Sequence, residues 1–174
     1  MIRSFLIGLV AGSRAITPLA TVSDAARRGA LPGRNPDFAW LGHPFVSEGL
    51  KLLAAGEFWG DKMQSAPDRI GASGMIARVL TGGLAGAALA PRGRVRVGGA
   101  LGAVAAVAAA YLTYEARMRA MRHFGQASTG VVEDALTLAA ARCVIAGAPG
   151  PAEAPLKVKG GWRRPAFLRM IRRR

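Results

Sequence analysis

The chain has 174 residues, 51% of them hydrophobic, and a formal net charge of +14. Its length accommodates one domain, and the single cysteine excludes both an intrachain disulfide and a thiolate metal cage. The charge favours an anionic partner, which is either nucleic acid or anionic lipid. No zinc spacing, RRM-type strand or basic recognition helix is present, so nucleic acid is the less favoured of the two.

Two apolar segments occur in the first third of the chain. Ser4 to Ser23 is interrupted only by Arg14, and Thr17-Pro18 predicts a kink or an unwound point within it. Pro44 to Asp61 is weaker, because it also contains charged residues, namely Glu48, Lys51 and Glu57. Both segments predict helices that reach into a membrane.

Three more apolar segments follow. Ile70 to Pro91 is broken only by Arg78, and Val97 to Tyr114 contains no charged residue at all. About 20 apolar residues cross the ~30 Å hydrocarbon layer, so Val97 to Tyr114 is the clearest spanning candidate. Val131 to Gly147 is weaker. The sequence therefore predicts an all-α fold, a small polytopic membrane helix bundle of four to five spanning or re-entrant helices, over residues 1–148.

Small residues recur at a spacing of four within the three best segments, as the pairs Gly8/Gly12, Gly82/Gly86 and Gly98/Gly102. Such pairs allow close approach of helix backbones in lipid, where packing and not the hydrophobic effect drives association. A stripe in the weaker second segment, Gly49, Leu53, Gly56 and Gly60, predicts that this helix also packs inside the bundle. A soluble Ala/Gly-rich bundle is the alternative, but these helices lack the Leu, Ile and Phe side chains that such a core uses.

The distribution of basic residues predicts an orientation. With five crossings, Arg27–Arg34, Arg92–Arg96 and the C-terminal tail lie on one side. The other side receives the remaining basic residues, namely Arg3, Arg69, Arg117, Arg119 and Arg122, with Lys62 near its border. The positive-inside rule then places the C-terminus in the cytoplasm and the N-terminus outside, in a bacterial cytoplasmic membrane.

Charged residues at membrane depth are the candidate functional residues. Glu57 and Asp61 are four residues apart and share a helix face, so a positive partner, a cation or a proton must compensate them. We predict a polar membrane cluster of Arg14, Glu57, Asp61, Lys62, Arg78, Glu133 and Asp134. For Glu133-Asp134 the simpler alternative is a favourable position at a helix N-terminus, and for Arg14 and Arg78 it is a structural ion pair with these acids.

The tail, residues 149–174, begins after the breaker Ala148-Pro149-Gly150-Pro151 and holds eight basic residues between Lys157 and Arg174. Aromatic and basic side chains alternate in it, which is typical of a segment lying on an anionic lipid surface. The predicted lipid-contacting residues are Trp162, Arg163, Arg164, Phe167 and Arg169. A flexible solubilising tail is the alternative.

The chain resembles a family of small bacterial membrane proteins known as domain of unknown function 4126 (DUF4126). The resemblance rests on Gly8–Pro18, on Ala55-Gly56-Glu57 through Asp61-Lys62, on Ala77–Gly86 and on Val132–Leu136. Gln64 and Asp68 stand where the pattern has a proline and a serine. The resemblance implies a membrane location over Met1 to Gly147 and supplies no activity.

No Gly-x-Ser-x-Gly elbow, Walker loop, Rossmann fingerprint or HExxH motif occurs. We therefore predict no catalytic residues, no metal and no cofactor, and we favour a transporter-like or channel-like bundle over an enzyme. The first alternative is a lipid-organising protein anchored by its basic tail, and the second is a membrane-embedded lipid-modifying enzyme. A homo-oligomer is left open.

Overall fold

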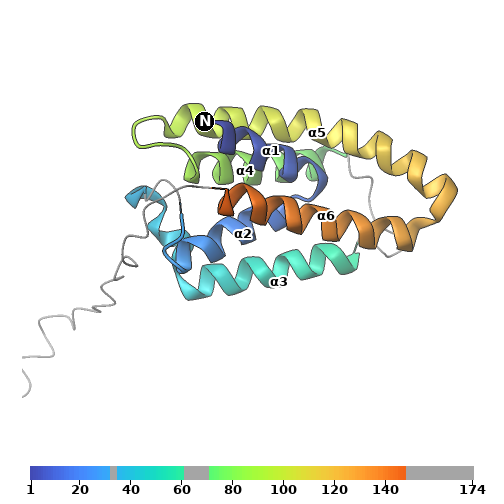
Figure 1. The fold of residues 1–174 in the computed structure, drawn as a ribbon, viewed down its shortest axis with the longest axis horizontal. Coiled ribbons are helices and arrows are strands. Elements are labelled where there is room, and N and C mark those ends of the chain that lie inside the picture. Colours follow the sequence, from blue (N-terminus) through green and yellow to red (C-terminus); the bar gives the residue numbers. More distant parts are fainter. Residues whose placement is uncertain (32–34, 61–70, 148–174) are drawn as a thin grey trace, which may run out of the picture.

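The computed structural model describes residues 1–31, 35–60 and 71–147, and all regular structure in these ranges is helical (Figure 1). The prediction of an all-α fold is confirmed. In chain order the elements are α1 (Ile2–Ser13), α2 (Ile16–Arg27), the 3₁₀ helix η1 (Pro36–Gly42), α3 (Pro44–Gly60), α4 (Ala72–Ala88), α5 (Val95–Phe124) and α6 (Gln126–Ala146).

The first predicted segment consists of two short helices and not of one interrupted helix from Ser4 to Ser23. The chain leaves helical geometry at Arg14, whose φ of −135° and ψ of 122° are those of an extended residue. Pro18 accounts for this position, because in a continuous helix its ring would collide with the carbonyl group four residues earlier, that of Arg14. The chain then reverses, so that α2 runs back toward the end of the bundle from which α1 started (Figure 1).

Glycine brings α1, α4 and α5 into close contact. α1 runs parallel to α5, with Gly8 against Gly102, and α4 runs antiparallel to α5, with Gly86 against Gly98. A methyl group on any of these glycines would collide with backbone atoms of the facing helix. The predicted contact pairs, Gly8/Gly12, Gly82/Gly86 and Gly98/Gly102, all lie at these helix contacts, as expected for packing through small residues.

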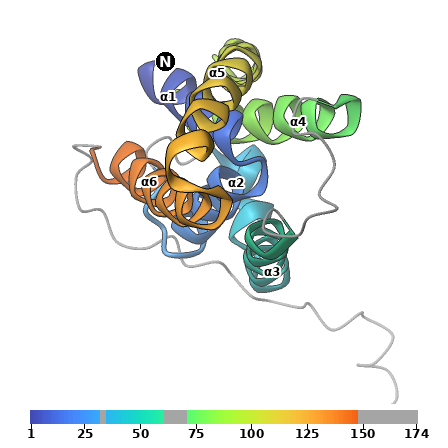
Figure 2. The ribbon, with the colours of Figure 1, turned by 90° about the vertical axis from the view of Figure 1, so that its right-hand side faces the viewer.

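Helix α3 lies at the edge of the bundle (Figure 2), where it packs antiparallel to α2 through its two buried residues, Ser47 and Ala54. The expected packing stripe is wrong. Among the described residues no atom lies within 4 Å of where a side chain at Gly49, Gly56 or Gly60 would begin. The stripe is displaced from the buried side of the helix, so its glycines do not face a neighbouring helix of the described chain.

Helix α5 continues to Phe124, ten residues beyond the predicted end at Tyr114. Of the helices that the structure describes, it alone has the length and apolar composition needed to cross a membrane. Gly125, with φ of +79°, ends it, and α6 returns beside it. Glycine adopts a positive φ without steric strain, which explains why the turn occurs at this residue.

Both ends of the described chain lie at the same end of the bundle. The Nη2 group of Arg3 donates to the carbonyl oxygen of Gly147 over 3.0 Å, and Ser4 lies beside Gly98 near the start of α5. The prediction that Arg3 lies opposite Arg92–Arg96 is therefore wrong. The prediction assumed that the chain crosses once between Ser4 and Ser23. Because the chain reverses at Arg14, it returns to the end of the bundle from which it started.

The interior of the bundle consists mainly of small side chains, with a few larger ones such as Ile7, Val22 and Leu41, and many other large apolar side chains are exposed. Buried apolar positions are dominated by alanine, for example Ala85, Ala106 and Ala110. By contrast Phe45 is 85% exposed and Trp59 is 78% exposed. Further exposed large apolar residues on the other helices are Ile2, Ile76, Leu80, Val104, Leu112 and Leu136. Large apolar residues exposed in this way indicate an interaction surface.

Candidate functional site at the break between α1 and α2

The break between α1 and α2 leaves two helix ends inside the bundle. Gly12, at the end of α1, packs against Ala109 and Ala110 in the middle of α5. Helix ends carry unsatisfied backbone groups and partial charges, positive at the N-terminus and negative at the C-terminus. Side chains from other helices must therefore satisfy both ends.

Glu57 of α3 satisfies the N-terminus of α2. Its Oε1 atom accepts a hydrogen bond from the backbone N–H of Ala15 over 2.8 Å, and its Oε2 atom accepts one from Ile16 over 3.0 Å. Neither Ala15 nor any other residue supplies a side-chain cap at this end from α2 itself. The Glu57 carboxylate therefore acts as the cap, and its negative charge lies at the positive end of the helix dipole.

Arg78 of α4 satisfies the C-terminal end of α1. Its Nε group donates to the carbonyl oxygen of Gly12 over 3.0 Å, and its Nη1 group donates to the carbonyl oxygen of Gly74 over 2.9 Å. The Thr113 hydroxyl of α5 also lies 3.4 Å from the Gly12 oxygen. A cation thus lies at the negative end of one short helix and an anion at the positive end of the other.

Arg14 is the residue at the break and is 1% exposed. Its guanidinium group forms an ion pair with Asp134 of α6 and lies 5.3 Å from the centre of the Phe58 ring, a cation–π distance. This contact ties the tip of the α1–α2 hairpin to α3 and α6. Of the predicted polar cluster, the structure therefore brings four residues together, Arg14, Glu57, Arg78 and Asp134.

Glu133 lies in a separate contact one residue before Asp134. Its Oε2 atom is 2.6 Å from Nη1 of Arg117 on α5, and both side chains are largely buried. Nearby, the hydroxyl groups of Ser13 and Thr137 are 3.0 Å apart and join α1 to α6. These residues line a groove of about 920 Å³ between α5 and α6, which adjoins the break through Ser13.

Arg117 and Thr137 were missed in the sequence although a signal for them exists. In an antiparallel helix hairpin, residues at equal distance from the turn face each other. Arg117 and Glu133 are each eight residues from Gly125, and Thr113 and Thr137 are each twelve residues from it. The predicted segment Val97–Tyr114 ends before Arg117 and so places Arg117 in a loop, where this symmetry does not apply.

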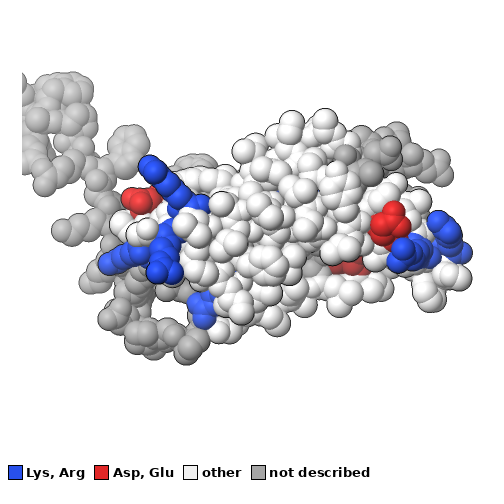
Figure 3. Space-filling model, turned by 90° about the horizontal axis from the view of Figure 1, so that it is seen from above, with Lys and Arg blue, Asp and Glu red and all other residues white. Residues whose placement is uncertain are grey.

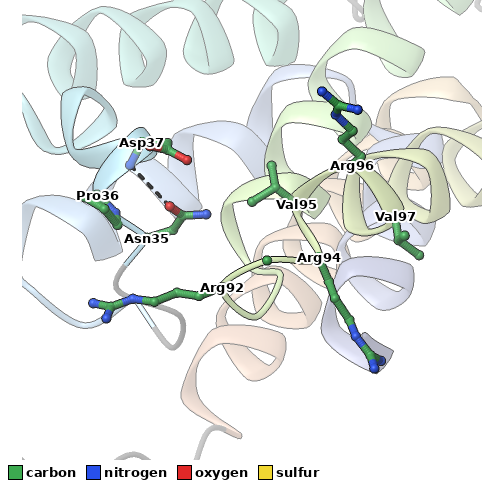
Figure 4. A pocket seen from close by; sticks show the side chains of 9 residues that line it. Asn35, Pro36, Asp37, Arg92, Arg94, Val95, Arg96 and Val97 are labelled. Carbon is green, nitrogen blue, oxygen red and sulfur yellow. Dashed lines mark hydrogen bonds between the residues drawn. The ribbon is translucent and has the colours of Figure 1, made fainter.

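A second cavity, of about 730 Å³, lies between η1 and the turn from α4 to α5 (Figure 4). It is lined by Asn35, Pro36, Asp37 and residues 92–97. Figure 4 shows that Arg92 extends toward η1, whereas Arg94 and Arg96 point away in different directions. The three guanidinium groups do not converge, so the cavity lacks the geometry of an anion-binding site.

The remaining predicted residues lie outside the described ranges. These are Asp61, Lys62 and the tail residues Trp162, Arg163, Arg164, Phe167 and Arg169. Within those ranges no group of three or more His, Cys, Asp or Glu side chains is placed to hold a metal ion. What the break offers is a carboxylate, that of Glu57, which accepts hydrogen bonds from two backbone N–H groups at the start of α2.

Comparison with known proteins gives one match. Residues 2–154 match the family model described as "Domain of unknown function (DUF4126)". Neither the curated proteins nor the solved structures contain a match to this chain.

Proposed function

We propose that this chain, which belongs to the DUF4126 family, is a multi-pass protein of the bacterial cytoplasmic membrane that works as a small transporter-like bundle. Its working centre is the break between α1 and α2, and Glu57 is the carboxylate that exchanges a proton or a cation. The observation that carries this proposal is a helix break that lies inside the bundle and is lined by charged residues. The outer surface of the bundle at that level is apolar.

The surface distribution of charge supports the membrane location. In Figure 3 the blue and red side chains gather at the two ends of the molecule, and the wide zone between them is uncharged. Large apolar residues such as Leu80, Val104 and Leu112 are also exposed. An exposed apolar belt of this kind marks an interaction surface, and small residues at helix contacts are typical of helices that associate in lipid.

Dimensions support the same proposal. The uncharged run of α5, Val97–Tyr114, has eighteen residues and a length of about 27 Å, close to the ~30 Å hydrocarbon layer. Gly12 lies beside Ala109, about 18 Å along that run from Val97. The break therefore lies within the apolar layer, and α1 and α2 form a re-entrant hairpin.

The positions of basic residues support a revised orientation. One end of the bundle carries Arg3, the α4–α5 turn, and Arg27 and Arg28 at the end of α2. The opposite end carries Arg119 and Arg122 together with Glu115. The positive-inside rule places the first end in the cytoplasm. The hairpin enters and leaves there, α3, α4 and α6 run through the layer beside α5, and both ends of the described chain are cytoplasmic.

Broken helices with exposed ends at membrane depth are where secondary transporters bind ions and substrates. Here the end of α2 is held by Glu57, which uses both carboxylate oxygens as acceptors. Protonation, or coordination of a cation, removes acceptor capacity and charge from this contact and so weakens the link between α3 and the hairpin tip. Uptake at Glu57 is thereby coupled to movement of the hairpin.

A flux assay tests this proposal. The full chain is reconstituted into vesicles containing a pH-sensitive dye, and proton entry is followed after a potassium-diffusion potential is imposed. Wild-type vesicles should acidify faster than empty ones, and Glu57→Gln should abolish the difference. Glu48→Gln is the matched control, since Glu48 lies on the same helix but is exposed and pairs with Arg27 and Lys51 at the cytoplasmic end. Unchanged flux in Glu57→Gln vesicles, or no flux in wild-type vesicles, would reject proton transport through Glu57.

The alternative function is lipid organisation, in which the tail contacts anionic headgroups through Trp162, Arg163, Arg164, Phe167 and Arg169. Deleting residues 149–174 should then abolish binding to vesicles rich in anionic lipid, whereas the transport proposal expects flux to persist. One observation favours a role in lipid contact, namely the apolar groove between α5 and α6.

A further inference from the structure

The groove between α5 and α6 exists because α1 is short. α1 ends at Ser13, halfway along α5, and beyond it the two long helices continue as a hairpin with no other described helix between them. The space left has a volume of about 920 Å³. Its floor is formed by the end of α1, at Leu9, Val10 and Ser13.

The lining of the groove changes in character along its length. Around the level of the Arg117–Glu133 ion pair it also contains the hydroxyl groups of Ser128 and Thr129. Toward the middle of the bundle it is lined by the apolar side chains of Leu9, Val10, Leu136 and Ala140 and by the hydroxyl groups of Ser13, Thr113 and Thr137. The groove is therefore largely apolar, with its charged residues toward one end of the bundle and only uncharged residues toward the middle.

This change in polarity matches the depth profile of a membrane leaflet. Arg117 lies three residues beyond Tyr114, the end of the uncharged run of α5, and so lies at the level of lipid headgroups in the proposed orientation. From Glu133 to Ala140 the groove extends about 10 Å along α6, within the ~15 Å depth of one hydrocarbon leaflet. Its volume lies within the range of small-molecule sites.

We infer that the groove is a binding site for a membrane phospholipid of the non-cytoplasmic leaflet, with one acyl chain between α5 and α6. The acyl chain contacts Leu136, Ala140 and the end of α1, and the zwitterionic headgroup lies at the level of Arg117, whose charge is paired with that of Glu133. This inference rests on the membrane location proposed above and is independent of transport. A lipid bound here contacts Ser13, the residue before the break, and so lies next to the candidate functional site.

Photolabelling of the full chain tests the inference. The protein is reconstituted into phosphatidylcholine vesicles that contain a small fraction of phosphatidylcholine with a diazirine at the end of one acyl chain. After irradiation and flotation, labelled residues are identified by mass spectrometry. We expect labelling at Leu9 and Val10, which form the floor of the groove, to exceed that at Leu80 and Val104, which are exposed on the outer surface.

Two variants on adjacent residues make the test specific. Ala140→Trp fills the groove and should lower labelling at Leu9 and Val10 by about fivefold or more, because the bulky ring takes up the volume that the chain requires. Ala139→Trp is the control, since Ala139 is exposed on α6 but does not line the groove, and it should leave this labelling unchanged. Both variants must float with the vesicles to be compared.

Each outcome has one meaning. Equal labelling of groove and outer-surface residues, or no effect of Ala140→Trp, would show contact with bulk lipid only and would overturn the inference. Crosslinks between two copies of the chain through groove residues would also overturn it, in favour of a dimer contact. Failure of the wild-type chain to float with the vesicles would reject the membrane location itself, and with it both proposals.

Discussion

The carboxylate of Glu57 and the backbone N–H of Ala15 are joined by a hydrogen bond of 2.8 Å across 42 residues of sequence. The bond links α3 to the tip of a hairpin formed by two helices too short to cross a membrane on their own. Since the same carboxylate also accepts from Ile16 over 3.0 Å, Glu57 holds the helix end through both oxygens. The Glu57 carboxylate therefore contributes to the stability of the hairpin.

Replacing Glu57 by Gln should lower the free energy of unfolding in detergent by about 1–2 kcal/mol, because the cap loses one acceptor oxygen and the charge that favours a helix N-terminus. Thermal unfolding followed by circular dichroism measures this change. Glu48→Gln on the same helix should leave the unfolding temperature unchanged. If Glu57→Gln melts together with the wild type, Glu57 does not hold the helix end in solution.

Replacing Arg78 by Lys keeps the charge but should destabilise the protein by about 1–3 kcal/mol, since a single ammonium group lacks the fork that bridges the carbonyl oxygens of Gly12 and Gly74. The measurement is again thermal unfolding in detergent. Arg96→Lys serves as the control, because Arg96 is exposed near the start of α5. Equal effects of the two variants would contradict the bridging role of Arg78.

Much of the helix packing was predictable from sequence, whereas the path of the chain was not. Pairs such as Gly82/Gly86 predict close contact because a missing side chain has a direct geometric consequence. Pro18 predicts an interruption of the helix. The same local residues are compatible with a kinked helix and with two helices between which the chain reverses direction. Only contacts remote in sequence, such as the one between Arg14 and Asp134, decide between them.

The site was predictable to a similar extent. Buried charges at Arg14, Glu57, Arg78 and Asp134 are costly in an apolar surrounding, so their presence in apolar segments identifies them. The contacts that these charged residues form depend on the reversal of the chain at Arg14 and on the turn at Gly125. Arg117, the partner of Glu133, could be recognised only after α5 was known to continue to Phe124.

Replacing Gly102 by Ala should weaken the contact of α5 with both α1 and α4, because the added methyl group would collide with the backbone of Gly82. Overpacking of this kind costs about 1–3 kcal/mol. Gly49→Ala is the matched control, since no described atom lies near that position, and alanine should instead favour the helix. Unfolding temperatures in detergent should therefore shift in opposite directions, and a stabilised Gly102→Ala variant would contradict the packing.

Replacing Asp134 by Asn should destabilise the protein by about 3–5 kcal/mol, the usual cost of removing one partner from a buried ion pair. Arg14 would then keep its charge at a position that is 1% exposed. The exposed pair of Glu115 and Arg119 provides the comparison, and Glu115→Gln should have little effect. Recovery of stability in Asp134→Asn combined with Arg14→Met would show that the uncompensated charge is the cause.

The proposed topology places Met1, the α4–α5 turn and Gly147 on one side of the membrane and Arg119 on the other. Single cysteines at Gly93 and Arg119, introduced into a Cys143→Ser background, test this with a membrane-impermeant maleimide applied to intact cells. Arg119→Cys should be labelled in intact cells, and Gly93→Cys only after the membrane is opened. A third cysteine at Arg3 discriminates between the models, because a re-entrant hairpin places it with Gly93, whereas a single crossing from Ser4 to Ser23 places it with Arg119. Labelling of Arg3→Cys in intact cells, together with Arg119→Cys, would therefore exclude the re-entrant hairpin.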